Sequence, residues 1–122
     1  MGLDQYAYSR LTEQSPDKIE PRFIWRKHAK LQEFMERLFE ARTGQGAAEL
    51  NCSELELKAE DIATLQAMVE RQDLPESPGG FFYGHQFQDE QAEAYRETDL
   101  AFCDWARTVL KTREKVFYSC WW

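Results

Sequence analysis

Two kinds of apolar spacing alternate along this chain, and their order constrains the fold more than any other feature. One kind places apolar residues three and four positions apart, which is the spacing of a single helix face. Its clearest example consists of Leu31, Phe34, Met35, Leu38 and Phe39. Glycine commonly follows the last turn of a helix. We therefore expect a first helix that is introduced by Arg22–His28 and ends before Gly44 and Gly46.

The same spacing predicts two further helices. One runs from about 59 to 72, and the prolines and glycines of Leu74–Gly80 end it. Its apolar face contains Ile62, Leu65, Met68 and Val69. The other, from about 89 to 112, is expected to be the longest. Its apolar face contains Phe102, Trp105, Ala106, Val109 and Leu110.

The second kind of spacing is the alternation or clustering of apolar residues that is typical of strands. It predicts strands at 3–9, 50–57 and 116–122, and a short strand or ordered loop at 81–84. Residues 10–21 are polar, contain two prolines and are expected to form a loop. Only about three residues separate the last helix from the last strand, so these elements should be antiparallel neighbours.

A chain of 122 residues can bury one core. We therefore expect a single α+β domain over residues 1–122, in which three helices pack on a small sheet of three or four mainly antiparallel strands. A three-layer α/β fold with a parallel sheet is the alternative.

Charge and cysteine content narrow the class of function. The chain has 15 basic and 22 acidic residues and a formal charge of −7, which argues against binding nucleic acid or an anionic membrane. No apolar stretch is long enough to span a membrane, and the N-terminus is unlike a signal peptide. Cys52, Cys103 and Cys120 form no Cys-x-x-Cys pair. We expect a cytoplasmic protein without a metal or a cofactor.

Four short segments resemble those of a widespread group of small bacterial and bacteriophage proteins. They are the start Met1–Tyr6 (MGLDxY), Trp25–Lys27 at a helix start, Gly80–Gly84 (GFFxG) and the aromatic ending Tyr118–Trp122. The resemblance spans nearly the whole chain. It is consistent with an auxiliary or host-interaction role, and it implies no activity and no catalytic residues.

The first candidate site motif is Trp25, Arg26 and His28. It combines an aromatic plane, a guanidinium that recognises anions through two hydrogen bonds, and a ring that titrates near neutral pH. At a helix start, backbone N–H groups also favour anions. The alternative is that Trp25 belongs to the core and its neighbours are solvated.

The second motif is Gly79–His85, in which Phe82 and Tyr83 could stack on a flat ligand beside His85. Glycines there permit close backbone approach. The alternative is a buried edge strand with glycine turns.

The third motif is the aromatic C-terminus. Strand geometry places Tyr118 and Trp121 on opposite faces, so one face should be core and the other should line a pocket or an interface. Packing of both faces is the alternative. Asp4 and Asp99 adjoin apolar runs and are candidates for burial beside an arginine.

Together these motifs predict a binding or interaction module. Its ligand would be a small anionic or aromatic molecule or a protein partner, and the protein would be a monomer or a homodimer that buries the aromatic terminus. The expected site residues are Trp25, Arg26, His28, Phe82, Tyr83, His85, Tyr118 and Trp121. The alternative is a small enzyme in which His28 or His85 is the acid/base and Arg26 clamps an anion. No catalytic constellation has a diagnostic spacing, so binding is favoured.

Overall fold

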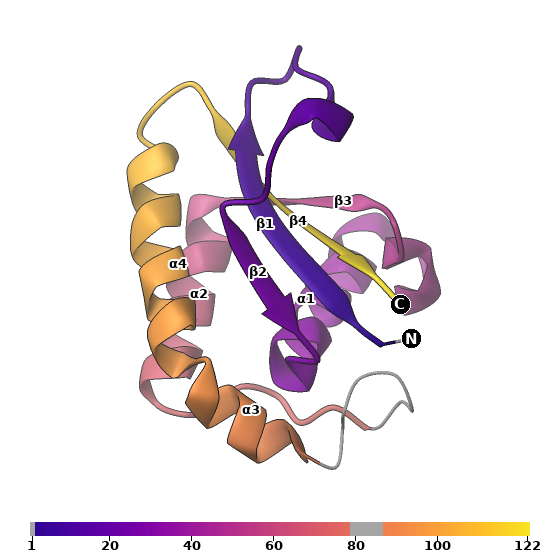
Figure 1. Cartoon of the computed structure of the whole chain (residues 1–122), viewed down its shortest axis with the longest axis vertical. Coiled ribbons are helices and arrows are strands. Elements are labelled where there is room, and N and C mark those ends of the chain that lie inside the picture. The colour runs from indigo at the N-terminus through magenta and orange to yellow at the C-terminus, as the bar shows by residue number, and fades with distance from the viewer. Residues whose placement is uncertain (1, 79–86) are drawn as a thin grey trace.

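The chain folds into a sheet of antiparallel strands with helices on one side (Figure 1). The computed structural model describes residues 2–78 and 87–122. Its strands are β1 (Asp4–Arg10), β2 (Phe23–Arg26), β3 (Glu54–Leu57) and β4 (Lys115–Trp121). Its helices are α1 (Ala29–Thr43), α2 (Ala59–Glu70), α3 (Gln88–Ala94) and α4 (Arg96–Val109), with short 3-10 turns at Pro16–Lys18 and Ala47–Leu50. The α+β class is confirmed, but the described residues form four helices instead of three.

The sheet has the order β2-β1-β4-β3, and all three pairings are antiparallel. The predicted antiparallel arrangement is therefore confirmed, and the parallel alternative is wrong. The two strands nearest the chain ends pair at the centre of the sheet, from Asp4 opposite Trp121 to Arg10 opposite Lys115. This pairing places the start of β1 beside the end of β4 (Figure 1).

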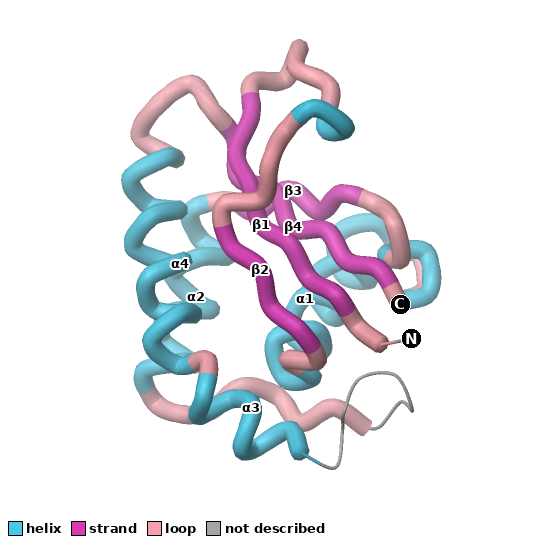
Figure 2. Tube along the Cα trace, in the orientation of Figure 1, coloured by secondary structure: helices cyan, strands magenta, loops and turns pink. Residues whose placement is uncertain are grey.

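The α-helices lie on one side of the sheet, and the 3-10 turn Pro16–Lys18 lies on the other (Figure 2). Alternation along the strands sends Ala7, Trp25 and Tyr118 into the core beneath the helices, where each is fully buried. The residues between them face the other side and form the open sheet face. No α-helix covers it, but the segment 16–21 lies over part of it beside Tyr6 and Tyr8. The predicted apolar stripes of α1, α2 and α4 supply much of the helical side of this core.

The structure of segment 22–28 differs from the prediction. We expected this segment to introduce the first helix. Phe23–Arg26 is an edge strand paired with β1. Lys27 then adopts a left-handed conformation with φ 54°, which turns the chain sharply, and His28 caps α1. The aromatic and β-branched content of Phe23–Trp25 suits a strand, and proximity to the helical stripe obscured this signal.

Two other elements are shorter than predicted. The helix expected at 89–112 divides at Tyr95 into α3 and α4. The strand expected at 50–57 begins only at Glu54, after a 3-10 turn. The strand or loop expected at 81–84 lies outside the described residues.

On each edge strand of the sheet, a side chain forms hydrogen bonds with backbone groups that a further strand would otherwise use. The Tyr95 hydroxyl accepts a hydrogen bond from the Arg26 N–H of β2 at 3.0 Å and also contacts the Arg26 carbonyl. On β3, the Arg42 guanidinium donates to the Glu56 carbonyl. Each edge is therefore partly closed to further strand pairing.

Candidate functional site

A buried histidine–aspartate pair lies between the sheet and α4. The Nε2 atom of His28 lies 2.7 Å from Oδ2 of Asp99, and Trp25 Nε1 donates to Oδ1 of the same carboxylate at 2.8 Å. Asp99 therefore holds two aromatic side chains that come from separate elements, β2 and the start of α1. The His28 ring stacks on Tyr95 with a centroid distance of 5.2 Å. Its Nδ1 atom has no hydrogen-bond partner among the described residues.

A second buried network of hydrogen bonds lies beneath the sheet and joins the sheet to α1. The Gln5 side-chain amide forms two hydrogen bonds with the backbone of His28. It accepts one from the His28 N–H at 2.9 Å and donates one to the His28 carbonyl at 3.1 Å. Gln5 also donates to the Tyr118 hydroxyl at 2.9 Å, and that hydroxyl donates to Gln32 Oε1. Gln32 in turn donates to Glu36 at 2.9 Å. This network of hydrogen bonds fixes where α1 begins after β2, and therefore also fixes the position of His28.

A cavity of about 320 Å³ opens next to the histidine–aspartate pair, with Asp99 in its wall. It lies among α1, α3, α4 and the end of α2. The lining residues are Lys30, Val69, Gln72, Leu74, Asp89, Ala92, Glu93, Arg96 and Asp99. Lys30 bonds Asp89 across it at 2.7 Å, with the lysine side chain only 14% exposed and the aspartate 79% exposed. A cation thus lies deep and its acidic partner lies at the rim.

Arg96 is the least satisfied cation of this cavity. One of its terminal nitrogens donates to the Glu70 carbonyl at 3.2 Å. Its Nε atom is buried and has no hydrogen-bond partner within the described part of the chain. A buried donor without an acceptor costs about 1–3 kcal/mol. Arg96 is also one of the residues that line the cavity.

The buried thiols are poor nucleophiles. Burial, with a smaller contribution from Asp99, raises the pKa of Cys103 to about 12. Burial also raises the pKa of Cys120 to about 12, and its contact with the Gln32 amide only partly offsets this. Both therefore remain thiols at neutral pH. Within residues 2–78 and 87–122, no cluster of three or more His, Cys, Asp or Glu side chains could hold a metal ion.

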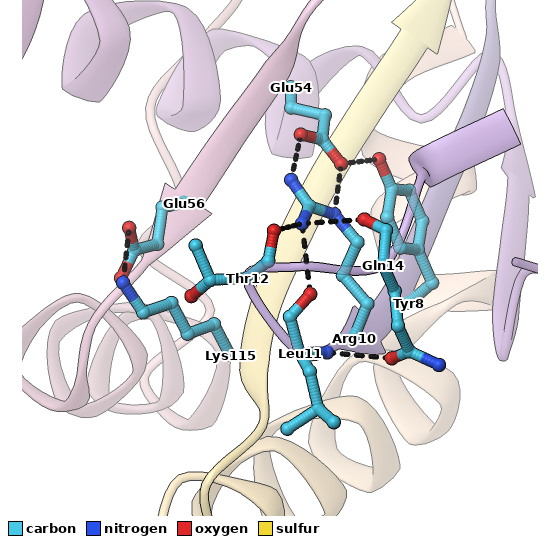
Figure 3. A network of polar contacts seen from close by, with 8 residues as sticks. All are labelled: Tyr8, Arg10, Leu11, Thr12, Gln14, Glu54, Glu56 and Lys115. Carbon is cyan, nitrogen blue, oxygen red and sulfur yellow. Dashed lines mark hydrogen bonds and ion pairs between the residues drawn. The ribbon is translucent and has the colours of Figure 1, made fainter.

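The open sheet face carries a separate ionic network (Figure 3). Arg10 contacts both carboxylate oxygens of Glu54, at 2.6 and 3.0 Å, and Tyr8 donates to one of them. Another nitrogen of Arg10 donates to carbonyls of the loop after β1, including those of Leu11 and Gln14. Burial tends to raise the pKa of Glu54, but the bonds from Arg10 and Tyr8 outweigh it and hold the pKa below its ordinary value of 4.5. This network anchors the loop against the sheet.

The predicted site residues within the described part of the chain do not converge on one place. Trp25, His28 and Tyr118 lie in the buried polar networks under the helices. Arg26 pairs with Asp4 at 3.1 Å on the open sheet face, and its side chain is 72% exposed. Trp121 lies on that same open face. The expected single site containing both Arg26 and Tyr118 is therefore wrong, because strand alternation sends them to opposite faces.

Phe82, Tyr83 and His85 lie outside the described residues. The two singled-out carboxylates differ in their partners: Asp4 bonds Arg26 as expected for a pairing with arginine, although it is only partly buried. Asp99 is buried, but its partners are His28 and Trp25 instead of an arginine.

Sequence reasoning missed Gln5, Gln32, Lys30 and Arg96. The burial of Gln5 could have been predicted from the sequence, because Gln5 alternates with Leu3 and Ala7 and therefore lies on the inward face of β1. Gln32 similarly adjoins the apolar stripe of α1. Lys30 and Arg96 had none, because the cavity between α1 and α4 joins segments that are far apart in sequence.

Comparison with known proteins yields no relative. No protein-family model, curated protein or solved structure matches the chain. Among the described helices, none combines the length and the apolarity that crossing a membrane requires. The geometry of the cavity beside Asp99 therefore supplies the evidence for function.

Proposed function

We propose that the chain is a binding module that holds a small anionic ligand in the cavity beside Asp99. The observation that carries the proposal is that Arg96, one of the residues lining the cavity, has a buried Nε–H with no acceptor among the described residues. A carboxylate or phosphate oxygen is the natural acceptor for a guanidinium N–H.

The rest of the lining combines charged and apolar groups. Lys30 provides a second cation, which is paired with Asp89, and Glu93 and Asp99 are also in the lining. Val69, Leu74 and Ala92 provide apolar walls, so an anion would have to bind at Arg96, away from these carboxylates. The cavity volume lies at the lower end of the range of about 300–1,000 Å³ that is usual for small-molecule pockets. An aromatic or branched carboxylate combines the required features.

Binding is favoured over catalysis by the state of the reactive groups. His28 is fully buried and its Nε2 is engaged by Asp99. Arg26, the expected anion clamp of the enzymatic alternative, is on the open sheet face. The two buried thiols are held in the protonated form. An anion in the cavity therefore meets donors, but it meets no activated nucleophile among the described residues.

The test is an NMR titration of the ¹⁵N-labelled chain with benzoate, and with benzyl alcohol as the neutral probe. Benzoate should produce saturable shifts at the Arg96 Nε–H and at the amides of Gln72 and Ala92. Arg96→Gln should weaken benzoate binding at least about tenfold, which corresponds to about 1.4 kcal/mol and is close to the lower end of the range of about 1.5–3 kcal/mol for a hydrogen bond to a charged group.

The matched control is Arg107→Gln on the same helix, since Arg107 is half-exposed and does not line the cavity. Its affinity for benzoate should equal that of the unmodified chain. Equal affinities for benzoate and benzyl alcohol, or the absence of saturable shifts with benzoate and with inorganic phosphate, would contradict the proposal.

A further inference from the structure

A second cavity lies between the open sheet face and the segment 16–21, and we call it the sheet-face cavity. Its volume is about 270 Å³. Pro16, Asp17, Ile19 and Pro21 line it from the segment, and residues of β1, β3 and β4 line it from the sheet. It is on the side of the sheet away from the α-helices, so it is separate from the cavity beside Asp99.

The register of the strands explains why the sheet is hollowed there. Ser119 of β4 is opposite Tyr6 of β1 on one side and opposite Glu54 of β3 on the other. Cross-strand neighbours on one face are about 4.5–5.5 Å apart. Because serine is much smaller than either neighbour, its position forms the floor of a depression. Tyr8, two residues from Tyr6 on the same strand, adds a second aromatic wall.

The Tyr8 ring is held in place before any ligand arrives. It stacks on Phe117 with a centroid distance of 5.9 Å, and its hydroxyl donates to Glu54 (Figure 3). Arg10 in turn contacts both oxygens of that carboxylate. A ligand that contacts Tyr8 therefore removes little side-chain freedom, which lowers the entropic cost of binding.

The charge of this cavity is negative. Asp17 and Glu54 contribute carboxylates, and none of the described residues in its wall is basic. Arg10 offsets the charge of Glu54, whereas Asp17 forms no ion pair with any residue in the described part of the chain. Burial is the main cause that raises the pKa of Tyr8, and the charge of Asp17 adds to it. One uncompensated negative charge thus acts on the aromatic wall.

We propose that the sheet-face cavity binds a small alkylammonium cation. Tyrosine rings attract cations through their π faces, and a carboxylate balances the charge of the ligand. Pro16, Ile19 and Pro21 supply apolar surface for its methyl or methylene groups. The volume is just below the usual range of about 300–1,000 Å³ for small-molecule pockets, which suits a small free molecule. This inference does not depend on the anion proposed for the cavity beside Asp99.

The composition of the wall disfavours other ligands. An anion would meet the carboxylates of Asp17 and Glu54 without a basic side chain from the described wall. A metal ion would need a denser set of ligands, and residues 2–78 and 87–122 contain no cluster of three or more His, Cys, Asp or Glu side chains that could hold one. An organic cation matches both the aromatic rings and the charge.

The test is an NMR titration of the ¹⁵N-labelled chain with choline. The neutral probe is 3,3-dimethylbutan-1-ol, in which carbon replaces the ammonium nitrogen and the shape is kept. Choline should produce saturable shifts at the amides of Tyr6, Asp17 and Ser119, with a dissociation constant on the order of 1 mM. The amides of Gln72 and Ala92, which report on benzoate in the other cavity, should not respond to choline. Failure of one proposal is therefore distinguishable from failure of the other.

Two pairs of variants assign the binding energy to named groups. Asp17→Asn should weaken choline binding at least about threefold, the size expected for one partly screened charge. Its matched control is Glu20→Gln, which removes the same charge from an exposed position in the same segment that does not line the cavity. Tyr6→Leu should also weaken choline binding at least about threefold, whereas Tyr6→Phe keeps the aromatic face and should bind as the unmodified chain does.

Three results would overturn the proposal. They are equal affinities for choline and 3,3-dimethylbutan-1-ol, equal losses in Asp17→Asn and Glu20→Gln, and no saturable shift up to about 50 mM choline, far above the expected constant. Equal losses would mean that choline senses only the net charge of −7. Circular dichroism checks that each variant is folded, and the comparison of Asp17 with Glu20 decides the proposal if Tyr6→Leu is not.

Discussion

Replacement of Asp99 by alanine should be among the most destabilising single changes in this chain. Asp99 is 1% exposed, and its carboxylate binds both Trp25 Nε1 and His28 Nε2. Its removal leaves two buried nitrogens without their partner, at about 1–3 kcal/mol each. The expected loss is therefore about 2–6 kcal/mol, a large part of the total of about 5–15 kcal/mol that holds a domain folded.

A second substitution separates hydrogen bonding from simple loss of volume. Asp99→Asn keeps an oxygen that can accept from Trp25, but it presents an N–H where the His28 ring nitrogen needs an acceptor. It should cost about 1–3 kcal/mol, because a single group is left unsatisfied or must change tautomer. Asp99→Asn should therefore lie between the unmodified chain and Asp99→Ala.

The assay is urea unfolding followed by far-UV circular dichroism. The control is Asp104→Ala, because Asp104 is on the same helix, its side chain is 70% exposed, and its side-chain ion pair among the described residues is with its neighbour Arg107. That change should stay within about 0.5 kcal/mol of the unmodified chain. Unfolding free energies of Asp99→Ala and Asp104→Ala that agree within 1 kcal/mol would refute the reasoning.

The other predictions concern the ionic network and the thiols. Because the folded-state pKa of Glu54 is below its ordinary value, Glu54 contributes stability above about pH 4.5, and this is lost as the pH falls through the lower folded value. Glu54→Gln should thus be less stable than the unmodified chain at pH 7. Its unfolding free energy should also decline less between about pH 5 and about pH 3. Equal declines in the two proteins would argue against the assigned network. Of the three thiols, exposed Cys52 alone should react rapidly with Ellman's reagent in the native protein, and Cys103 and Cys120 should react only after unfolding. Rapid native reaction of all three would contradict the burial that raises the pKa of the other two.

Much of the fold was predictable because the spacing of apolar residues along the sequence indicates where helices and strands form. The stripe of α1 and the glycine that ends the helix at Gly44 are local signals, and the structure follows both. The division of the last helix at Tyr95 and the turn at Lys27 were not predictable in this way. Each depends on the backbone angles of one residue, and tertiary packing sets those angles.

The candidate site was predictable only in its parts. His28 was identified from its chemistry and Asp99 from its apolar neighbours. The pairing of the two across 71 residues depends on how α4 lies against the sheet, and no local pattern encodes that. Arg26 was placed with His28 because both precede a helix, but the edge strand turns its side chain to the opposite face.

The occupied edges of the sheet have a consequence for the chain at high concentration. Open strand edges are the usual starting points for fibril growth, since each added chain presents a fresh edge to the next. Here the Tyr95 hydroxyl and the Arg42 guanidinium occupy backbone groups on the two outermost strands. Growth by strand addition would first have to displace both side chains. Polymerisation of the folded chain by strand addition is thereby opposed.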